Sequence, residues 1–126
     1  MSLANIIRAA NAKSGEYSVK AEKRMVVVRF KVQCQPDKTD AMVEAMKEII
    51  GACRPLPGVI HFDIARDLMD PHSLIATEVF EDRAAMKNEE SQPEIAKVIE
   101  LMQAGALTRP PEWTIFDVAS SESPTM

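Results

Sequence analysis

The spacing of hydrophobic positions changes several times along the first half of the chain, and each change predicts a new element. Residues 24–34, RMVVVRFKVQC, are almost continuously apolar and β-branched, which predicts a strand with little exposure to solvent. From Asp37 onward the spacing becomes helical, with Asp37 as the predicted N-cap and the RPLPG segment as the end of the helix. The apolar stripe of this helix contains Met42, Val43, Met46, Ile49, Ile50 and Cys53.

The second half of the chain predicts a hairpin, two short helices and a final strand. GVIHFDIARD (58–67) and SLIATEVFED (73–82) are typical of strands, and the Asp70-Pro71 step between them suits a turn. Asp82 caps a short helix that begins DRAAM, and Pro93 ends that helix and begins another. The buried face of the last helix is predicted to be Ile95, Val98, Ile99 and Met102. PPEWTIFDVA (110–119) is the last predicted strand.

The two ends of the chain differ from this pattern. Leu3, Ile6, Ile7 and Ala10 share one helical face, so residues 1–23 are predicted to be a leader with a short amphipathic helix. Residues 24–119 form the predicted domain, and the polar segment 120–126 is a predicted disordered tail.

The order of the predicted elements within the domain is βαββαβ. It predicts an α+β, ferredoxin-like fold, in which a four-stranded antiparallel sheet carries the helices on one face. The other face of such a sheet is normally polar, but here Met25, Val27, Ile75 and Val79 alternate onto it. We therefore predict that this face packs against a second copy of the chain in a homodimer.

Composition and charge restrict the classes of partner. The chain has 126 residues, 46% of them hydrophobic, and no apolar run reaches the roughly 20 residues that a membrane span needs. No secretory signal is visible, and Cys34 and Cys53 lack metal-binding or disulfide spacing, which favours a reducing cytoplasm. The net charge of −4, with the basic residues concentrated near the N-terminus, argues against a nucleic-acid partner.

The order and spacing of several segments resemble the antibiotic biosynthesis monooxygenase domain family. The segments are VVVRFKV, the helix with an acidic start, PGVIHFDIARDLMDP, EVFED and PPEWTIFDV. The resemblance implies a two-fold dimer whose sheets form a barrel, with a pocket between sheet and helices in each subunit. It also implies oxidation of aromatic polyketides, hydroquinones or related compounds by O₂ without a metal or flavin cofactor.

The chain departs from the pattern of the family and its relatives at four places. Members often have a tryptophan at the end of the third strand, where this chain has Phe80. They often have a histidine on the next short helix and sometimes another after the proline, where Glu89 and Glu94 stand. Relatives that degrade haem rely on an asparagine in the first strand, which VVVRF lacks, so the resemblance points away from haem degradation.

The glutamates of MKNEESQPEI (86–95) have different predicted roles. Ser91 and Glu94 have capping-box spacing, which explains Glu94 as the cap of a helix. Glu90 is predicted to face solvent. Glu89 lies three and four residues after Met86 and Ala85, which are expected to face inward. A carboxyl in an apolar pocket has a raised pKa and can transfer protons near neutral pH, although glutamates near helix ends are mostly solvated.

Two residues on the predicted strands are further candidates. His61 either lines the pocket, where it could deprotonate a phenol, or lies at the dimer interface. Arg29 is a charge on an otherwise apolar strand and either pairs with an acid, Asp63 or Glu78, or binds an anionic group of a substrate. Two isolated histidines and two cysteines provide no predicted metal site.

These candidates lead to three hypotheses for function. The first is a cofactor-independent monooxygenase acting on a small aromatic, phenolic or quinol substrate, with Glu89 or His61 as base. The substrate would contact Phe30, Met46, Phe62, Phe80, Met86 and Trp113. The second is a non-catalytic dimeric barrel that binds a small apolar molecule or has a stress-related role. The third is an isomerase or decarboxylase that uses the same acid/base residue without O₂.

Overall fold

The computed structural model describes residues 24–125, and the predicted leader, residues 1–23, lies outside the described residues. The elements, in chain order, are β1 (Met25–Gln33), the 3₁₀ turn η1 (Pro36–Lys38), α3 (Thr39–Cys53), β2 (Val59–Asp67), β3 (Asp70–Phe80), α4 (Arg83–Glu90), α5 (Pro93–Gln103) and β4 (Glu112–Val118). The predicted α+β, ferredoxin-like order is therefore confirmed, with the second helical region divided into α4 and α5. No helix in the described part of the chain is long and apolar enough to cross a membrane.

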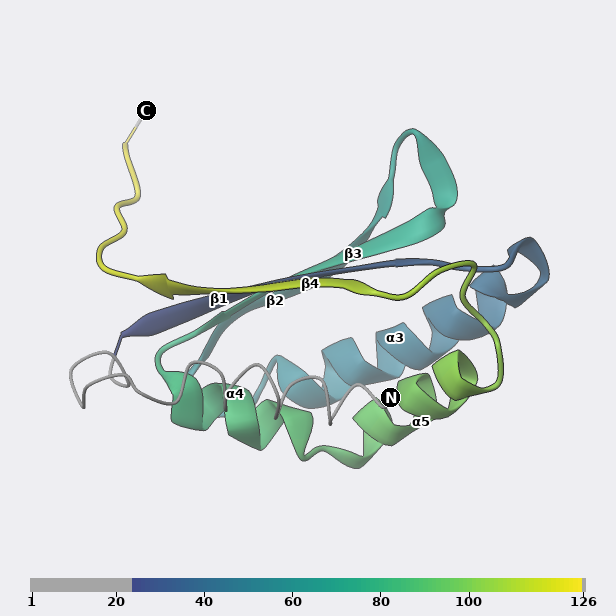
Figure 1. Ribbon diagram of the computed structural model, residues 1–126. Helices are drawn as coiled ribbons and strands as arrows, with labels where there is room; N and C mark the ends of the chain where they lie inside the picture. Colours follow the sequence, from purple (N-terminus) through teal and green to yellow (C-terminus); the bar gives the residue numbers. More distant parts are fainter. Residues whose placement is uncertain (1–23, 126) are drawn as a thin grey trace.

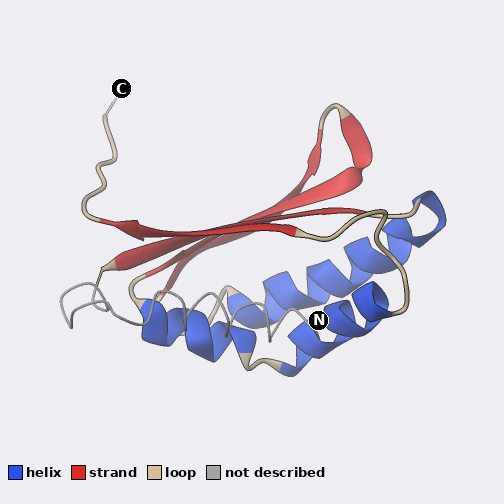
Figure 2. Ribbon diagram, in the orientation of Figure 1, coloured by secondary structure: helices blue, strands red, loops and turns tan. Residues whose placement is uncertain are grey.

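The four strands form one antiparallel sheet in the order β2-β3-β1-β4. The helices α3, α4 and α5 of the described residues lie on the same side of this sheet, as Figures 1 and 2 show. The β2–β3 hairpin bends away from the helices, and its tip carries Leu68 and Met69 with exposed fractions of 99% and 91%. The sheet thus has one face covered by helices, the helix face, and one open face.

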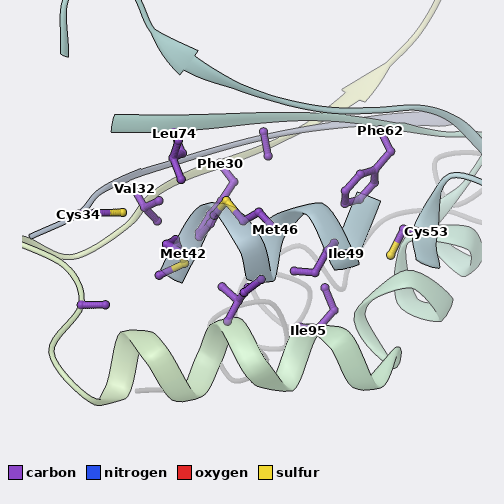
Figure 3. Close-up of a cluster of buried hydrophobic side chains, with 14 residues drawn as sticks. Phe30, Val32, Cys34, Met42, Met46, Ile49, Cys53, Phe62, Leu74 and Ile95 are labelled. Carbon is purple, nitrogen blue, oxygen red and sulfur yellow. The ribbon is translucent and has the colours of Figure 1, made fainter. Parts of the chain in front are cut away.

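Strand alternation decides which side chains enter the core. On β1, Val26, Val28, Phe30 and Val32 point to the helix face and are almost fully buried. Phe30 and Val32 pack against the apolar stripe of α3 and the inner side of α5, as Figure 3 shows for Phe30, Met46 and Ile95. Val26 and Val28 belong to a second cluster with Phe80 and with Ala85 and Met86 of α4. Burial of apolar area between sheet and helices is the main stabilising contribution to such a core.

Two predicted helix starts are wrong by one or two residues. Asp37 is not the N-cap of α3, because a 3₁₀ turn intervenes and the helix begins at Thr39, whose hydroxyl donates to the Gln35 carbonyl at 3.2 Å. The capping box of Ser91 and Glu94 is also absent. Proline favours the first helical position, so Pro93 begins α5 and makes Gln92 the N-cap, one residue later than predicted.

The position of α4 is determined by its N-terminal end. Asp82 caps the helix as predicted, since its Oδ1 accepts a hydrogen bond from the Ala85 backbone N–H at 2.9 Å. The next residue, Arg83, is 5% exposed and donates from Nη2 to both carboxylate oxygens of Asp117 at 3.1 Å. These contacts attach α4 to β4 across the end of the sheet, and they fix the rotation of the helix about its axis.

The open face is apolar over only part of its area. Met25, Val27, Val79 and Val118 are half-buried there, and Phe116 is 49% exposed. The strand register places Arg29 between Thr77 and Thr114 in the next row, and these three residues are exposed. An apolar patch, defined here as Met25, Val27, Val79, Phe116 and Val118, therefore borders a polar region.

Gly58 provides a test of how β2 approaches α4. Its φ is +81°, and a Cβ built there would lie 2.6 Å from the Cβ of Ala85. Gly105 has a similar φ of +90° but open space around it, and Gly51 is an exposed helical residue with no atom within 4 Å. Alanine variants at these three glycines therefore distinguish the energetic cost of a left-handed backbone conformation from the cost of steric overlap.

We expect Gly58→Ala to be the most destabilising of the three glycine-to-alanine variants. Gly105→Ala should lose roughly 1–2 kcal/mol from the left-handed conformation alone. Gly58→Ala should lose a further 1–3 kcal/mol, roughly, because α4 has to move away from β2. Gly51→Ala should be neutral or stabilising by up to about 1 kcal/mol. Urea denaturation measures these changes, and equal losses for Gly58→Ala and Gly105→Ala would contradict the close approach of α4.

Candidate functional site

A cavity of about 560 Å³, counting the part that opens to solvent, lies between the helix face of the sheet and the three helices. Its lining residues are Val28, Phe30, Met46, Ile49, Phe62, Ile64, Ala76, Glu78, Met86, Glu89, Ile95, Val98 and Trp113. All but two of the lining residues are apolar or aromatic, and the two exceptions are glutamates.

The sheet side of the cavity consists of two adjacent rows of paired residues. In one row Glu78 lies between Phe62 of β2 and Val28 of β1. In the next row Ala76 lies between Ile64 and Phe30, and Phe30 also pairs with Trp113 of β4. The rings of Phe30 and Trp113 meet edge to face with centroids 5.9 Å apart. The cavity thus has an aromatic wall next to one carboxyl group.

The helices supply the opposite side of the cavity and the second carboxyl group. Met46 and Ile49 come from α3, Ile95 and Val98 from α5, and Met86 and Glu89 from α4. Figure 3 shows Met46, Ile49 and Ile95 between the helices and the sheet, with Phe62 above α3. Glu89 lies one turn of α4 after Met86, so the two share the inward side of the helix.

Both carboxyl groups are buried, and their protonation is perturbed. Glu78 is 9% exposed and Glu89 is 5% exposed. Burial, together with the nearby charge of Glu90, raises the pKa of Glu89 to about 8. Burial also raises the pKa of Glu78 well above its ordinary value, and the charge of Glu89 contributes to this rise. Among the described residues, no basic side chain lines the cavity to compensate a negative charge.

Cys53 lies near this pair of carboxyl groups but does not share their chemistry. Its side chain is fully buried, and burial together with the charges of Glu89, Glu78 and Glu94 raises the pKa of the thiol to about 12. The thiol therefore stays neutral near pH 7, and a neutral thiol is a poor nucleophile and a poor base.

Trp113 is the third lining residue whose side chain can form a conventional hydrogen bond. Its indole Nε1 is buried and has no hydrogen-bond partner among the described residues. A buried donor without a partner costs free energy, and such a group is often satisfied by a ligand or an ordered water. This unsatisfied donor belongs to a residue that lines the cavity, so a bound polar atom or a water could satisfy it.

The structure brings together six of the nine residues predicted for the site. The residues that line the cavity are Phe30, Met46, Phe62, Met86, Glu89 and Trp113. Phe80, Arg29 and His61 do not line it. Phe80 is completely buried in a separate cluster with Val26, Val28, Ala85 and Met86, where it fills the core beside the cavity.

His61 lies on the open face of the sheet. Of its two predicted positions, in the pocket or at a dimer interface, only the second is on this face. A β-bulge between Val59 and His61 inserts Ile60 and breaks the two-residue alternation. Val59 consequently pairs with Phe80 on the helix face, whereas His61 pairs with Val79 and is exposed. An exposed histidine on the far side of the sheet cannot act as a base in the cavity.

Arg29 also lies on the open face and forms neither of the predicted ion pairs. Glu78 points to the opposite side of the sheet, and Asp63 pairs instead with Arg54 at 3.0 Å. Within residues 24–125 no ion pair to Arg29 is found. Arg29 therefore cannot bind an anionic group of a ligand inside this cavity.

The sequence-based prediction missed Glu78 as a site residue. Strand alternation contains the necessary signal, because Leu74, Ala76, Glu78 and Phe80 occupy every second position of β3. Leu74, Ala76 and Phe80 lie on the helix face, so Glu78 shares that face. Because glutamate carries a charge, Glu78 was instead predicted as a possible ion-pair partner of Arg29.

The described residues contain no group of three or more His, Cys, Asp or Glu side chains that could hold a metal ion. The polar groups of the cavity are two carboxyls and one indole N–H, a combination suited to hydrogen bonding and proton transfer.

The fold and cavity define a small ferredoxin-like α+β domain with an apolar, carboxyl-containing pocket between sheet and helices. The family model for antibiotic biosynthesis monooxygenase matches residues 25–101, which is more than half of the chain. The chain therefore belongs to the antibiotic biosynthesis monooxygenase family.

Solved structures share the fold at low sequence identity. The crystal structure of an antibiotic biosynthesis monooxygenase has 19% identity and a TM-score of 0.68, with 75% of this chain and 99% of that chain covered. Rv0793 from Mycobacterium tuberculosis has 20% identity and a TM-score of 0.69, with coverages of 79% and 99%. A conserved protein from Methanosarcina mazei Go1 has 18% identity and a TM-score of 0.67, with coverages of 79% and 98%. No curated protein matches the sequence significantly.

The raised pKa of Glu89 predicts that stability falls as pH rises. The carboxyl has a pKa near 4.5 in an unfolded chain and about 8 in the fold, so between these values only the folded chain keeps the proton. This stabilisation is complete below pH 4.5 and is lost as pH rises through 8. One such group lowers the free energy of unfolding by up to about 1.4 kcal/mol per pH unit.

We expect Glu89→Gln to make the decline in stability between about pH 6 and pH 8 shallower, because the amide does not titrate. Urea denaturation across this range measures the slope. Glu100→Gln, which removes an exposed carboxyl from α5, is the matched control and should retain the wild-type slope. Equal slopes for wild type and Glu89→Gln would show that Glu89 is already ionised in the folded protein.

Proposed function

We propose that the protein is a cofactor-independent monooxygenase that oxidises a small phenolic or quinol substrate in the cavity with O₂. The observation that carries the proposal is the burial of Glu89 in a cavity whose other lining residues, apart from Glu78, are apolar or aromatic. Family membership supports the general reaction class, and the cavity supports an aromatic substrate.

Glu89 is the proposed base. When ionised it accepts the proton of a phenolic O–H, and the substrate becomes an electron-rich phenolate. The phenolate transfers one electron to O₂, and the resulting radical and superoxide combine at a ring carbon that carries a hydrogen. Loss of water from this peroxide gives a quinone, so one oxygen atom of O₂ enters the product and the other leaves as water. Both electrons required for water formation come from the substrate.

The environment of Glu89 suits this role for a physical reason. A general base works best when its pKa is close to the working pH, and burial brings the pKa of this carboxyl to about 8. The apolar walls supplied by Phe30, Phe62 and Met86 would orient the ring and exclude water from the reactive anion.

We also propose that the protein is a homodimer that buries the open face. The apolar patch lies on this face, and Phe116 is too exposed to be explained by packing within one chain. Packing of two such patches around a two-fold axis would cover them while both cavities stay on the outer, helix-bearing sides.

Oxygen uptake with a panel of phenols, hydroquinones and anthrols tests the proposed activity. Wild-type protein should consume O₂ and form the quinone, and Glu89→Gln should lower turnover by roughly 10²–10⁴-fold. Glu100→Gln should retain the wild-type rate. Absence of uptake with every compound, with the compounds recovered unchanged, would exclude the oxygenase proposal. An undiminished rate in Glu89→Gln would remove this residue from the mechanism.

Light scattering tests the proposed dimer. The wild-type protein should show close to twice the chain mass of 14.0 kDa at micromolar concentration. Phe116→Glu introduces a charge into the apolar patch and should shift the mass towards that of one chain. Ala41→Glu, at an exposed position of α3, serves as the control and should leave the mass unchanged. A wild-type mass of one chain would contradict the proposal.

A further inference from the structure

The two carboxyl groups of the cavity approach it from opposite walls. Glu78 projects from β3, two residues before the end of the strand, and Glu89 projects from α4. They are close enough for the charge of Glu89 to affect the ionisation of Glu78. A molecule held between sheet and helix would therefore have one carboxyl on each side.

The proposed oxygenase reaction uses only one of these groups. A base is sufficient to form a phenolate, and Glu89 supplies it. Glu78 has no role in that step, although burial of a second carboxyl beside the first is costly and no ion pair to it is found among residues 24–125. An unused buried acid in a ligand cavity is a candidate for a second catalytic function.

The two carboxyls cannot both be ionised without a large energetic cost. The charge of Glu89 opposes ionisation of Glu78, and two adjacent negative charges are strongly disfavoured in an apolar cavity that has no cation among its described lining residues. With one proton on the pair, one carboxyl is a base and the other is an O–H donor. The two groups then face each other from the helix side and the sheet side of the cavity.

We propose that Glu78 and Glu89 make the cavity an oxygen-independent proton-transfer site that interconverts the keto and enol forms of a benzylic ketone, in which the acidic C–H lies between an aromatic ring and the carbonyl. This inference rests on the proposed function only in placing an aromatic substrate in the same cavity. Glu78 is assigned as the catalytic acid, a role that the oxygenase proposal does not contain.

The proton-transfer step is balanced without any further reactant. The Glu89 carboxylate removes a proton from the carbon next to the carbonyl, and the electrons of the broken C–H bond form the carbon–carbon double bond. The carbonyl π electrons move to oxygen, which takes the proton of Glu78. The products are the enol, protonated Glu89 and ionised Glu78. Proton transfer from Glu89 to Glu78, directly or through a water, restores the starting state.

The hydrogen-bonding groups of the lining fit this reaction. Only Glu78, Glu89 and Trp113 carry conventional hydrogen-bonding side chains among the lining residues. Negative charge develops on the carbonyl oxygen during enolisation, and it requires donors rather than acceptors. The Glu78 O–H and the buried Trp113 N–H, which has no partner among the described residues, are the two donors available.

Anaerobic hydrogen–deuterium exchange with 2-tetralone tests the proposal directly. The full-length protein in D₂O without O₂ should exchange the benzylic protons next to the carbonyl at least tenfold faster than buffer alone, as followed by ¹H NMR. Glu89→Gln should reduce the rate to the buffer rate, and Glu100→Gln should leave it unchanged. Absence of accelerated exchange in the wild-type protein would overturn the proposal.

Two substitutions at Glu78 distinguish a catalytic acid from a residue that only fills space. Glu78→Leu removes the donor and should lower the rate by roughly 10²–10³-fold. Glu78→Gln keeps an N–H donor but cannot transfer a proton easily, so its rate should lie between those of Glu78→Leu and wild type. Equal rates for wild type and Glu78→Leu, with both proteins folded by circular dichroism, would overturn the assignment of Glu78.

The pH profile of the exchange provides a readout that a structural role would not produce. The rate should rise as Glu89 ionises, and in Glu78→Gln the plateau should fall while the midpoint stays in place. The charged or titratable groups around this pair are Glu90 of α4, Glu94 of α5 and Cys53 of α3, and all three remain in the variant. A midpoint that moves by more than about one pH unit, with an unchanged plateau, would overturn the acid role.

Oxygen uptake measured in parallel separates this inference from the proposed function. Uptake with phenols but no tetralone exchange would overturn the inference and leave the oxygenase proposal intact. Exchange without uptake would support the inference and contradict the oxygenase. Loss of both activities in Glu89→Gln is the result expected if one base serves both reactions.

Discussion

The burial of Glu78 in the middle of the covered sheet is the constraint on which the site depends. β3 pairs with β1 on one side and β2 on the other, so this strand cannot move to bring the carboxyl into water. An ionised carboxylate in such a place costs several kcal/mol, by rough estimate, whereas the protonated acid costs much less. The fold therefore favours a proton on the pair of carboxyls, and the same proton is available for chemistry.

The second carboxyl depends on the attachment of a short helix. α4 is only eight residues long, and its helical hydrogen bonds alone do not stabilise such a segment. The Asp82 cap, the Arg83–Asp117 ion pair and the close contact of Gly58 with Ala85 together fix its position and rotation. Glu89 projects into the cavity because these contacts at the start of the helix determine where its last turn points.

The fold was predictable from the sequence because its signals are periodic. The alternation of β1 and the stripe of α3 identify the helix face without knowledge of any contact. Glu89 was predictable for the same reason, since it follows Met86 by three residues on one helical face. Glu78 was equally predictable from alternation, but the assumption that a charge on a strand must find an ion pair outweighed the pattern.

Other features depend on local events that carry no periodic signal. Regular strand alternation would place Val59 and His61 on the same face of the sheet, but the bulge at Ile60 places them on opposite faces. No feature of the sequence VIHFD indicates this bulge. The start of α5 illustrates two local rules in competition, because the preference of Pro93 for the first helical position overrode the capping-box spacing of Ser91 and Glu94. Phe80 was expected beside the ligand, but its side chain is completely buried in the core cluster that it forms with Val26, Val28, Ala85 and Met86.

The charge of the cavity restricts the form in which a substrate can enter. An anion would meet two carboxyls that share a proton, with no cationic side chain among the lining residues to compensate it. A neutral phenol or ketone avoids this repulsion and brings its own acidic proton to Glu89. In the proposed reactions, deprotonation would create the anion only after the molecule is bound, next to the donors Glu78 and Trp113. The pair of acids would thus disfavour binding of a charged substrate while providing the groups that form and stabilise that charge within the cavity.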